Sequence, residues 1–272
     1  HNIYLCFCTQ LPQLLCLHIL WNIDDGSKNQ CMSLQMLEIA ARSGTKAIFA
    51  TPHVIERANK PSWEEIKEKT QQLRQLCAEA QIDIMLYPGA EVQMNWELLP
   101  ELGATGAYCL NGGRYLLIEL PAAEIPAYAD EFWYELELKG ITPILAHPER
   151  YQQLRENPDL LLLWRRRGML MQCNSGSFTG MFGSSVCENA KVLLANGLVD
   201  LLGSDGHRSE GRNTDMSRAA AVIRQLAGEE VLRQLTETNP QAILKNQEIE
   251  LKQPKVLLED KPKSFWQKLF GK

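Results

Sequence analysis

The sequence of 272 residues lacks the features that mark several common protein classes. Its eight cysteines include no C-x-x-C pair, which argues against a disulfide scaffold and favours a reducing compartment. Lys and Arg (28) do not outnumber Asp and Glu (33), and the pI is about 5.7. The chain is therefore a poor general binder of nucleic acid or of an anionic membrane. A hydrophobic content of 45% excludes wholesale disorder.

Three catalytic signatures are also missing. The sequence contains neither G-x-S-x-G nor a Walker-type loop, and Ser175-Gly176-Ser177 is too short for a phosphate loop, so we expect it to shape a turn. A cysteine-nucleophile phosphatase requires an Arg six positions after its Cys. The residues at that position after each Cys are Pro12, Leu14, Asn22, Leu37, Asp83, Tyr115, Thr179 and Leu193. None is Arg, which excludes that mechanism.

The first 21 residues differ from the rest of the chain. They are mostly apolar, but polar residues and a proline interrupt the run, and none of them is Lys or Arg. Neither a membrane-spanning helix nor a signal peptide fits this pattern. The spacing of a possible zinc set is also too tight for the usual motif; its members are Cys6, Cys8, Cys16 and His18. We expect residues 1–13 to be an atypical extension, from a fragment start or a misread reading frame.

From Ile23 onward, short apolar runs alternate with stretches of helical periodicity. The predicted strands are 47–50, 82–87, 115–120, 142–146, 169–172 and 199–202. The predicted helices are 32–42, 62–80, 125–139, 158–167, 184–195, 215–227, and 229–237 and 241–245 around a break at Asn239-Pro240. Six or seven such units without a linker predict one α/β domain at residues 14–250, a distorted parallel (β/α)7-type TIM-like barrel.

The last segment, residues 251–272, has a different character. From Pro254 onward, five lysines are interspersed with aliphatic and aromatic residues: Lys255, Lys261, Lys263, Lys268 and Lys272. This pattern predicts a short basic amphipathic helix behind a flexible connector, suited to a membrane surface or a partner protein. The alternative is a helix that packs back on the barrel or frays in water.

Each predicted strand ends on a residue that can bind a metal or a phosphate. The loops after the strands form the open face of a β/α barrel, so these residues are expected to meet there. They are His53, Glu91, Glu119, His147, Asn174, Asp205 and His207. A first strand would add Cys16 and His18, which share a face because alternate strand residues point the same way. Asp25 follows it.

This donor set predicts a shared metal site. Imidazole and carboxylate ligands favour Mn, Fe, Zn or Mg over a structural zinc site. About nine ligands are more than one or two ions can use. Clustered divalent ions suit phosphate-ester hydrolysis, because they generate hydroxide at neutral pH and neutralise phosphate charge.

The motifs together resemble the PHP (polymerase and histidinol phosphatase) superfamily, and within it the CpsB/CapC-type bacterial tyrosine-protein phosphatases. The resemblance runs from His18 to about Lys245 through Asp24-Asp25-Gly26, Thr51-Pro52-His53, Gly89-Ala90-Glu91, Leu117-Ile118-Glu119, His147-Pro148-Glu149-Arg150, Ser204-Asp205-Gly206-His207 and Gly211-Arg212. It implies a three-metal site, usually with Mn2+. It also implies a substrate, the tyrosine-rich tail of a bacterial tyrosine autokinase that controls capsule or exopolysaccharide synthesis, and a cytoplasmic or membrane-peripheral location.

Matching positions carry the family's roles. The resemblance implies metal ligands at His18, Asp25, His53, Glu91, Glu119, His147, Asp205 and His207. Arg150 and Arg212 match positions near the phosphate, and His207 or a metal would stabilise the leaving phenolate. The alternative for Arg150 is a structural ion pair with Glu149 or a neighbour.

One motif departs from the family pattern, which opens with Asp-x-His-x-His. This chain has Leu14 in place of the Asp and Cys16 in place of the first His. A thiolate at Cys16 is softer than an imidazole and would favour zinc over manganese. Two alternatives therefore stay open beside the tyrosine phosphatase. One is another PHP phosphomonoesterase, such as a histidinol-phosphate type, and the other is a catalytically impaired PHP scaffold.

Overall fold

The computed structural model describes residues 13–103, 106–252 and 254, with side chains from residue 17 onward. All of the predicted extension at residues 1–13 except Gln13, and most of the predicted tail at 251–272, lie outside the described residues. Both therefore stay predictions. Among the described residues, no helix is long and apolar enough to cross a membrane.

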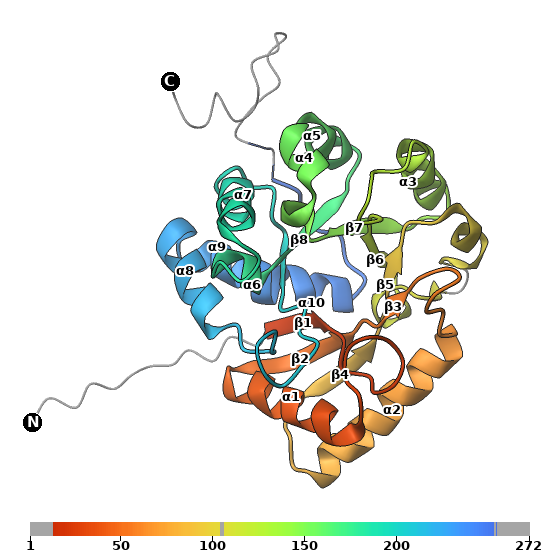
Figure 1. The fold of residues 1–272 in the computed structure, drawn as a ribbon, viewed down its shortest axis with the longest axis vertical. Coiled ribbons are helices and arrows are strands. Elements are labelled where there is room, and N and C mark those ends of the chain that lie inside the picture. Colours follow the sequence, from red (N-terminus) through yellow and green to blue (C-terminus); the bar gives the residue numbers. More distant parts are fainter. Residues whose placement is uncertain (1–12, 104–105, 253, 255–272) are drawn as a thin grey trace, which may run out of the picture.

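Parallel strands in the described part of the chain form two sheets that curl together at the centre of the molecule (Figure 1). The first sheet has the order β1 (Gln13–Leu17), β2 (Thr45–Ala50), β4 (Met85–Pro88). The second has the order β3 (His53–Val54), β5 (Glu91–Gln93), β6 (Tyr115–Glu119), β7 (Thr142–Ala146), β8 (Leu170–Asn174), β9 (Leu201–Gly203).

Two strand positions pass from one sheet into the other. Only Thr51 and Pro52 separate β2 from β3, and only Gly89 and Ala90 separate β4 from β5. At the far side, the backbone N–H of His18 donates to the carbonyl of Gly206 at 3.2 Å and ties the end of β1 to the segment after β9. The predicted single α/β domain with a curled parallel sheet is confirmed. The prediction of a closed seven-stranded barrel is confirmed only in part, because the paired strands divide between two sheets.

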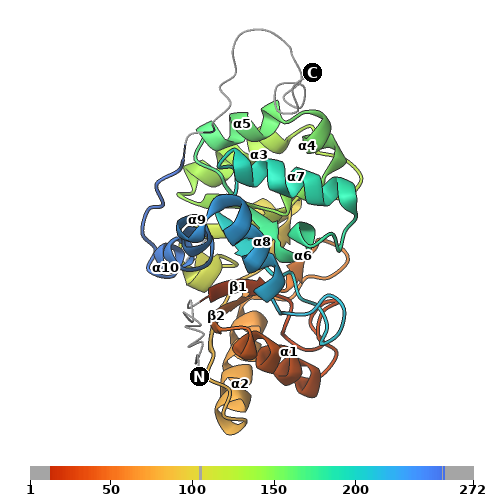
Figure 2. The same ribbon diagram turned by 90° about the vertical axis from the view of Figure 1, so that its left-hand side faces the viewer.

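Helices surround this sheet on its outer side, as Figures 1 and 2 show. The longer helices are α1 (Gln30–Arg42), α2 (Trp63–Glu79), α3 (Ala129–Leu138), α5 (Asp159–Arg166), α7 (Ser184–Ala195) and α8 (Ser217–Ala227). The short ones are η1 (Trp96–Glu101), η3 (Leu110–Gly112), η4 (Pro148–Arg150), α4 (Gln152–Glu156), α6 (Ser175–Phe178), α9 (Glu229–Arg233), η5 (Gln234–Thr238) and α10 (Asn239–Leu244).

Local sequence signals explain the ends of several helices. The hydroxyl of Ser62 accepts the backbone N–H of Glu65 at 3.1 Å, which confirms the predicted start of α2. Gly44 follows α1 with φ +96°, a conformation that glycine adopts at little cost. The predicted helix 125–139 begins later, at Ala129. The reason is Pro126, which disfavours helical backbone at the residue before it.

Two other predictions were wrong. The strand predicted at 82–87 starts at Met85, because Ile82 still bonds back to the end of α2 through the carbonyl of Cys77 (2.9 Å). The break predicted at Asn239-Pro240 is absent from the described chain, where α9, η5 and α10 follow one another without a gap. Pro240 directly follows the wider turn of the π-helix η5, in which the backbone N–H of Asn239 donates to the carbonyl of Gln234, five residues earlier.

Alternate strand residues divide the core into two layers. The inner layer lies within the curl and comprises Ala47, Phe49, Leu110, Tyr115, Leu117, Ile144, Ala146, Leu170, Leu201 and Ile243. The outer, larger layer packs the sheet against the helices. At the amino ends of the strands, the hydroxyl of Tyr115 donates to the carbonyl of Gln247 at 2.6 Å and anchors the segment after α10. The carboxyl ends stay open for the site.

A buried ion pair holds the amino ends of β8 and β9 together. Arg165 of α5 contacts Asp200 through both terminal nitrogens, at 2.5 and 2.8 Å, and donates to the carbonyls of Met169 and Gly197. Asp200 also accepts the backbone N–H of Met171 at 2.8 Å. Both side chains are almost fully buried.

Loss of one partner leaves an uncompensated buried charge, so we expect Arg165→Met to lower the free energy of unfolding by about 3–5 kcal/mol. Urea denaturation followed by circular dichroism measures the change. Arg166→Met is the matched control, because Arg166 is exposed on the same helix, and it should change stability by less than about 0.5 kcal/mol. Equal effects of the two substitutions would contradict this role of the ion pair.

Candidate active site

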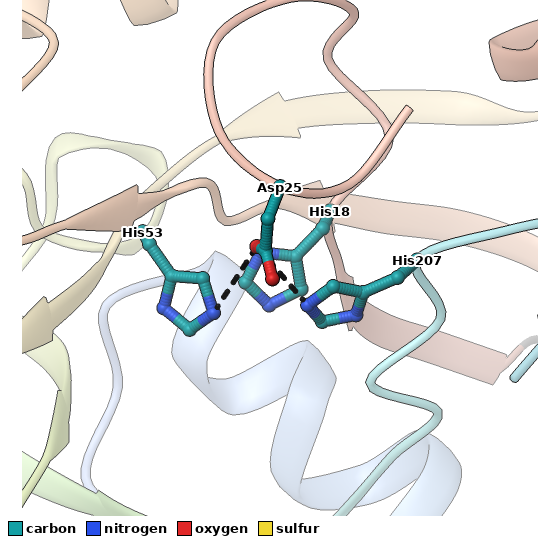
Figure 3. A group of neighbouring side chains, drawn as sticks. All are labelled: His18, Asp25, His53 and His207. Carbon is teal, nitrogen blue, oxygen red and sulfur yellow. Dashed lines mark ion pairs between the residues drawn. The ribbon is translucent and has the colours of Figure 1, made fainter. Parts of the chain in front are cut away.

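Four side chains from three separate parts of the chain converge at the carboxyl ends of the strands (Figure 3). His18 follows β1, Asp25 comes from the loop after it, His53 opens β3, and His207 follows β9. The His18 ring lies 4.2 Å from the His53 ring and 4.0 Å from the His207 ring, between centroids. Oδ1 of Asp25 lies 3.8 Å from Nε2 of His53 and 3.5 Å from Nε2 of His207.

The other predicted ligands extend this group on its inner side. Nε2 of His147 lies 3.0 Å from Oε1 of Glu91, and Nε2 of His18 lies 3.4 Å from Oε2 of the same carboxylate. Glu119 approaches His53 at 3.3 Å. Glu91 is almost fully buried. All the predicted ligands whose side chains are described thus lie in one cluster with Asp205, and Glu91 is near its centre.

The donor atoms fit a cluster of divalent ions. They form three overlapping groups, in each of which one ligand atom per residue lies within 4.8 Å of the others: His18, Asp25, His53 and His207; His18, Glu91 and Asp205; His53, Glu91 and Glu119. Imidazole nitrogens with carboxylate oxygens suit Mn, Fe or Zn. Within the described residues, the buried Nδ1 of His147 has no hydrogen-bond partner, which leaves a further donor atom for a ligand. Cys16 lies in β1 opposite Phe49, and its side chain is outside the described part.

Two of these residues have unusual backbone. His147 has φ 37° and Asp205 has φ 52°, in the left-handed region that non-glycine residues seldom adopt. The fold holds them there, for example through the backbone N–H of His147, which donates to the carbonyl of Gln172 at 2.8 Å. Such conformations concentrate at functional sites because the surrounding structure must compensate their cost.

Asp24 is a site residue that the sequence-based reasoning missed. Its carboxylate accepts from Nδ1 of His18 at 2.7 Å, from the backbone N–H of His53 at 3.0 Å and from that of Gly26 at 2.9 Å. One buried carboxylate thus orients one predicted ligand and fixes the backbone of another. Gly26 is required beside it, because a Cβ there would lie 2.3 Å from the carbonyl oxygen of His18. The Asp24-Asp25-Gly26 motif was the available signal, but only Asp25 was assigned a role.

The carboxylates and imidazoles shift one another's protonation. Burial alone would lower the pKa of His18, but the carboxylates of Asp24 and Glu91 raise it well above 6.5. Burial would raise the pKa of Glu91, yet His147 and His18 hold it well below 4.5. Burial together with the charge on His18 lowers the pKa of His207 to about 4. His207 is therefore a neutral imidazole at pH 7, the form that binds metals.

Asp205 connects this cluster to the two predicted arginines. Its Oδ2 accepts from Nη1 of Arg150 at 3.1 Å, from Nδ2 of Asn174 at 2.5 Å and from Arg212. Its Oδ1 lies 3.6 Å from Nε2 of His18. Arg150 pairs with Asp205 and not with Glu149, the alternative that the sequence left open.

The buried Glu149 binds residues of β8 and α6. It accepts the hydroxyl of Ser177 at 2.6 Å and the backbone N–H of Asn174 at 2.9 Å. The Ser175-Gly176-Ser177 segment, expected to be a turn, is the short helix α6. Glu149 thereby fixes the residue that bonds to Asp205.

A groove of about 740 Å³ opens over the cluster. Pro121, Ala122 and Ala123 line its outer part together with residues of α4. Both arginines line its deep end together with five of the predicted ligands: Asp25, His53, Glu119, His147 and His207. The hydroxyl of Tyr151 accepts the backbone N–H of Leu120 at 2.9 Å and donates to its carbonyl at 3.2 Å. Tyr151 thus fixes the start of this outer wall. The volume is in the range of small-molecule and peptide side-chain pockets.

Comparison with known proteins agrees with this geometry. The family model described as "Capsular polysaccharide synthesis, CpsB/CapC" matches residues 15–245. The chain is 34% identical to the tyrosine-protein phosphatase YwqE of Bacillus subtilis over 232 residues, which cover 85% of this chain and 91% of YwqE. It is 28% identical to the tyrosine-protein phosphatase CpsB of Streptococcus pneumoniae, with coverage of 85% and 97%.

A solved structure gives the same result for the fold. It comes from work on YwqE of Bacillus subtilis and CpsB of Streptococcus pneumoniae, described as unique metal-dependent tyrosine phosphatases. It matches with a TM-score of 0.84 at 32% identity and covers 91% of this chain and 99% of the matched chain. Taken with the match over residues 15–245, this establishes that the chain belongs to the CpsB/CapC family of capsular polysaccharide synthesis proteins.

Proposed function

We propose that this protein is a metal-dependent protein-tyrosine phosphatase. The observation that carries the proposal is the position of three overlapping ligand groups beside two arginines at the deep end of one groove. Relatives named tyrosine-protein phosphatases support it. A second PHP activity, such as histidinol-phosphate hydrolysis, has no comparable support.

We propose that the ions are held by His18, Asp25, His53, Glu91, Glu119, His147, Asp205 and His207, with Cys16 as a further ligand from β1. Three Mn2+ ions are the proposed occupants. Divalent ions of this kind supply hydroxide at neutral pH and neutralise phosphate charge. The proposed catalytic unit is the barrel at residues 14–250, with seven strand positions.

The protein's own residues bind and orient the phosphate. Arg150 and Arg212 would exchange the oxygen of Asp205 for phosphate oxygens, which the planar guanidinium group can bind through two parallel hydrogen bonds. His207 or a bound ion would stabilise the phenolate that leaves. The phenolate of tyrosine is a good leaving group, because the phenol has a pKa of about 10 and therefore needs less acid assistance than an aliphatic alcohol.

The substrate that we propose is a tyrosine-phosphorylated bacterial autokinase that controls capsule or exopolysaccharide synthesis, with its tyrosine-rich tail in the groove. The proposed location is the cytoplasm. The basic residues of segment 251–272 would add a peripheral contact with a membrane or with the partner. Deletion of residues 261–272 with unchanged vesicle binding and partner capture would remove that last proposal.

Loss of a proposed ligand should abolish most of the activity. Substitution of an outer partner of a metal ligand already costs about 10–100-fold in affinity or activity. We therefore expect His147→Ala and Asp205→Ala to reduce kcat/KM for a phosphotyrosine peptide by at least roughly 100-fold in the presence of Mn2+. The matched control is Asp83→Asn, because Asp83 is an exposed carboxylate that pairs with Lys46 and is not a proposed ligand. Full activity of either ligand variant would refute the site, and preference for histidinol phosphate would favour the alternative enzyme.

We expect Asp24 to affect how tightly the metal binds and not how the substrate is held. Asp24→Asn removes the charge that orients His18 and leaves one acceptor oxygen, where Asp24 has two, for the contacts with His18 and with the backbone of His53 and Gly26. We expect the midpoint of Mn2+ activation to rise about 10–100-fold, with kcat at saturating Mn2+ much less affected. Titration of activity with Mn2+ measures both quantities. A fall in kcat at an unchanged midpoint would contradict the orienting role.

Cys16 should influence which metal is bound. A thiolate favours zinc, so Cys16→His is expected to raise the ratio of manganese to zinc in the purified protein and to raise activity with Mn2+. Elemental analysis by mass spectrometry gives the ratio. An identical metal content in both proteins would mean that Cys16 is not a ligand. A wild-type protein that binds its full complement of metal without turnover, and that Cys16→His activates, would identify a catalytically impaired scaffold.

A further inference from the structure

A short turn between α6 and α7 projects an aromatic ring toward the site. Gly180 and Gly183 have φ of 81° and 95° and bound the Met181-Phe182 pair. The turn is fixed by its own backbone, because the N–H of Met181 donates to the carbonyl of Gly176 at 3.0 Å, and the N–H of Gly183 donates to that of Gly180 at 3.0 Å. The position of Phe182 is therefore set by backbone geometry.

The Phe182 ring contacts both arginines of the site. The guanidinium carbon of Arg150 lies 4.8 Å from the ring centroid, and that of Arg212 lies 5.6 Å from it. Both distances are within the range of cation–π attraction. Arg150 belongs to η4, and Arg212 lies in the loop after β9. One aromatic ring thus joins two cations that the chain brings from different elements.

The two arginines need such a contact because they repel each other. Both guanidinium groups bond to one oxygen of Asp205, which brings two positive charges close together. A phosphate would compete for the same N–H groups and weaken the Asp205 contact. The ring contact would survive that exchange, because cation–π attraction acts between the ring and the charge of each guanidinium group and needs none of the N–H groups that bond to Asp205.

The two arginines also have N–H groups available for a further acceptor. Their side chains are 33% and 29% exposed, and both line the groove. Within the part of the chain that the structure describes, the buried Nε of Arg212 has no hydrogen-bond acceptor. An anion at the deep end of the groove would supply one.

We infer that Phe182 is a positioning residue for phosphate recognition: its ring holds Arg150 and Arg212 side by side, with their N–H edges directed to the phosphate group of the substrate. The inference rests on the proposed function for the identity of the anion as a phosphate monoester. Phe182 does not itself contact the reacting atoms in this assignment.

The test compares the Mn2+-loaded wild-type protein with Phe182→Leu, which keeps an apolar side chain but removes the aromatic face. Phe182→Tyr restores that face, and Met181→Leu is the matched control at the exposed neighbouring position. Isothermal titration with orthophosphate measures anion affinity without turnover. Steady-state kinetics on a phosphotyrosine peptide separate KM from kcat, and thermal denaturation checks that each variant is folded.

Phe182→Leu is expected to weaken orthophosphate binding and to raise KM by about 5- to 30-fold, with kcat changed much less, because the arginines bind the phosphate before and during the reaction alike. Phe182→Tyr should recover most of the loss, and Met181→Leu should match the wild type. Unchanged phosphate affinity in Phe182→Leu, or a fall in kcat at constant KM, would overturn the inference.

A second variant moves the ring without removing it. A Cβ at Gly176 would lie 3.0 Å from Cε2 of Phe182 and 2.9 Å from Sδ of Met181, so Gly176→Ala should displace the ring and weaken phosphate binding in the same direction. This variant decides the matter if Phe182→Leu does not fold. If the affinity for orthophosphate depends on Phe182 but the wild-type protein hydrolyses no phosphotyrosine, the proposed function alone is refuted. Active protein with ring-independent phosphate affinity would refute the inference alone.

Discussion

The whole site depends on the hydrogen bonds and ion pairs that the carboxylate of Asp205 makes. One oxygen faces the imidazole of His18, and the other accepts from Arg150, Arg212 and Asn174. A single buried side chain therefore joins the proposed metal ligands to the two arginines that are proposed to bind phosphate. Asp205 makes these contacts from left-handed backbone, with φ 52°.

Charge balance explains why so many ionisable groups share a small buried volume. Carboxylates such as Asp24 and Glu91 raise the pKa of His18, and the imidazoles lower the pKa of Glu91 in return. Each group thus stabilises the charged form of its neighbour, as required where burial penalises every isolated charge. The excess of carboxylate oxygens makes the same volume attractive to divalent cations. Structural support for the ligands comes from outside the cluster, through Asn174 and Glu149.

The residues at the strand ends could be predicted because parallel strands place their carboxyl ends at one edge. That rule located His53, Glu91, Glu119 and Asp205 from the sequence alone. The boundaries that failed depend on local backbone chemistry, as at Pro126 and Pro240. The roles of Asn174 and Phe182 could not be predicted, because each depends on contacts between elements far apart in the sequence. No periodicity or spacing encodes that Phe182 meets Arg212.

The two walls of the groove differ in how they are held, and this difference bears on specificity. The arginine wall is fixed by Asp205, Phe182 and the buried Glu149 network, so the position of a phosphate is set by rigid, charged contacts. The opposite wall at residues 120–123 is an irregular segment that Tyr151 fixes at its first residue. A site of this kind discriminates strongly for the phosphate group and weakly for the residues around it. Such a distribution would suit the proposed substrate, a tyrosine-rich tail.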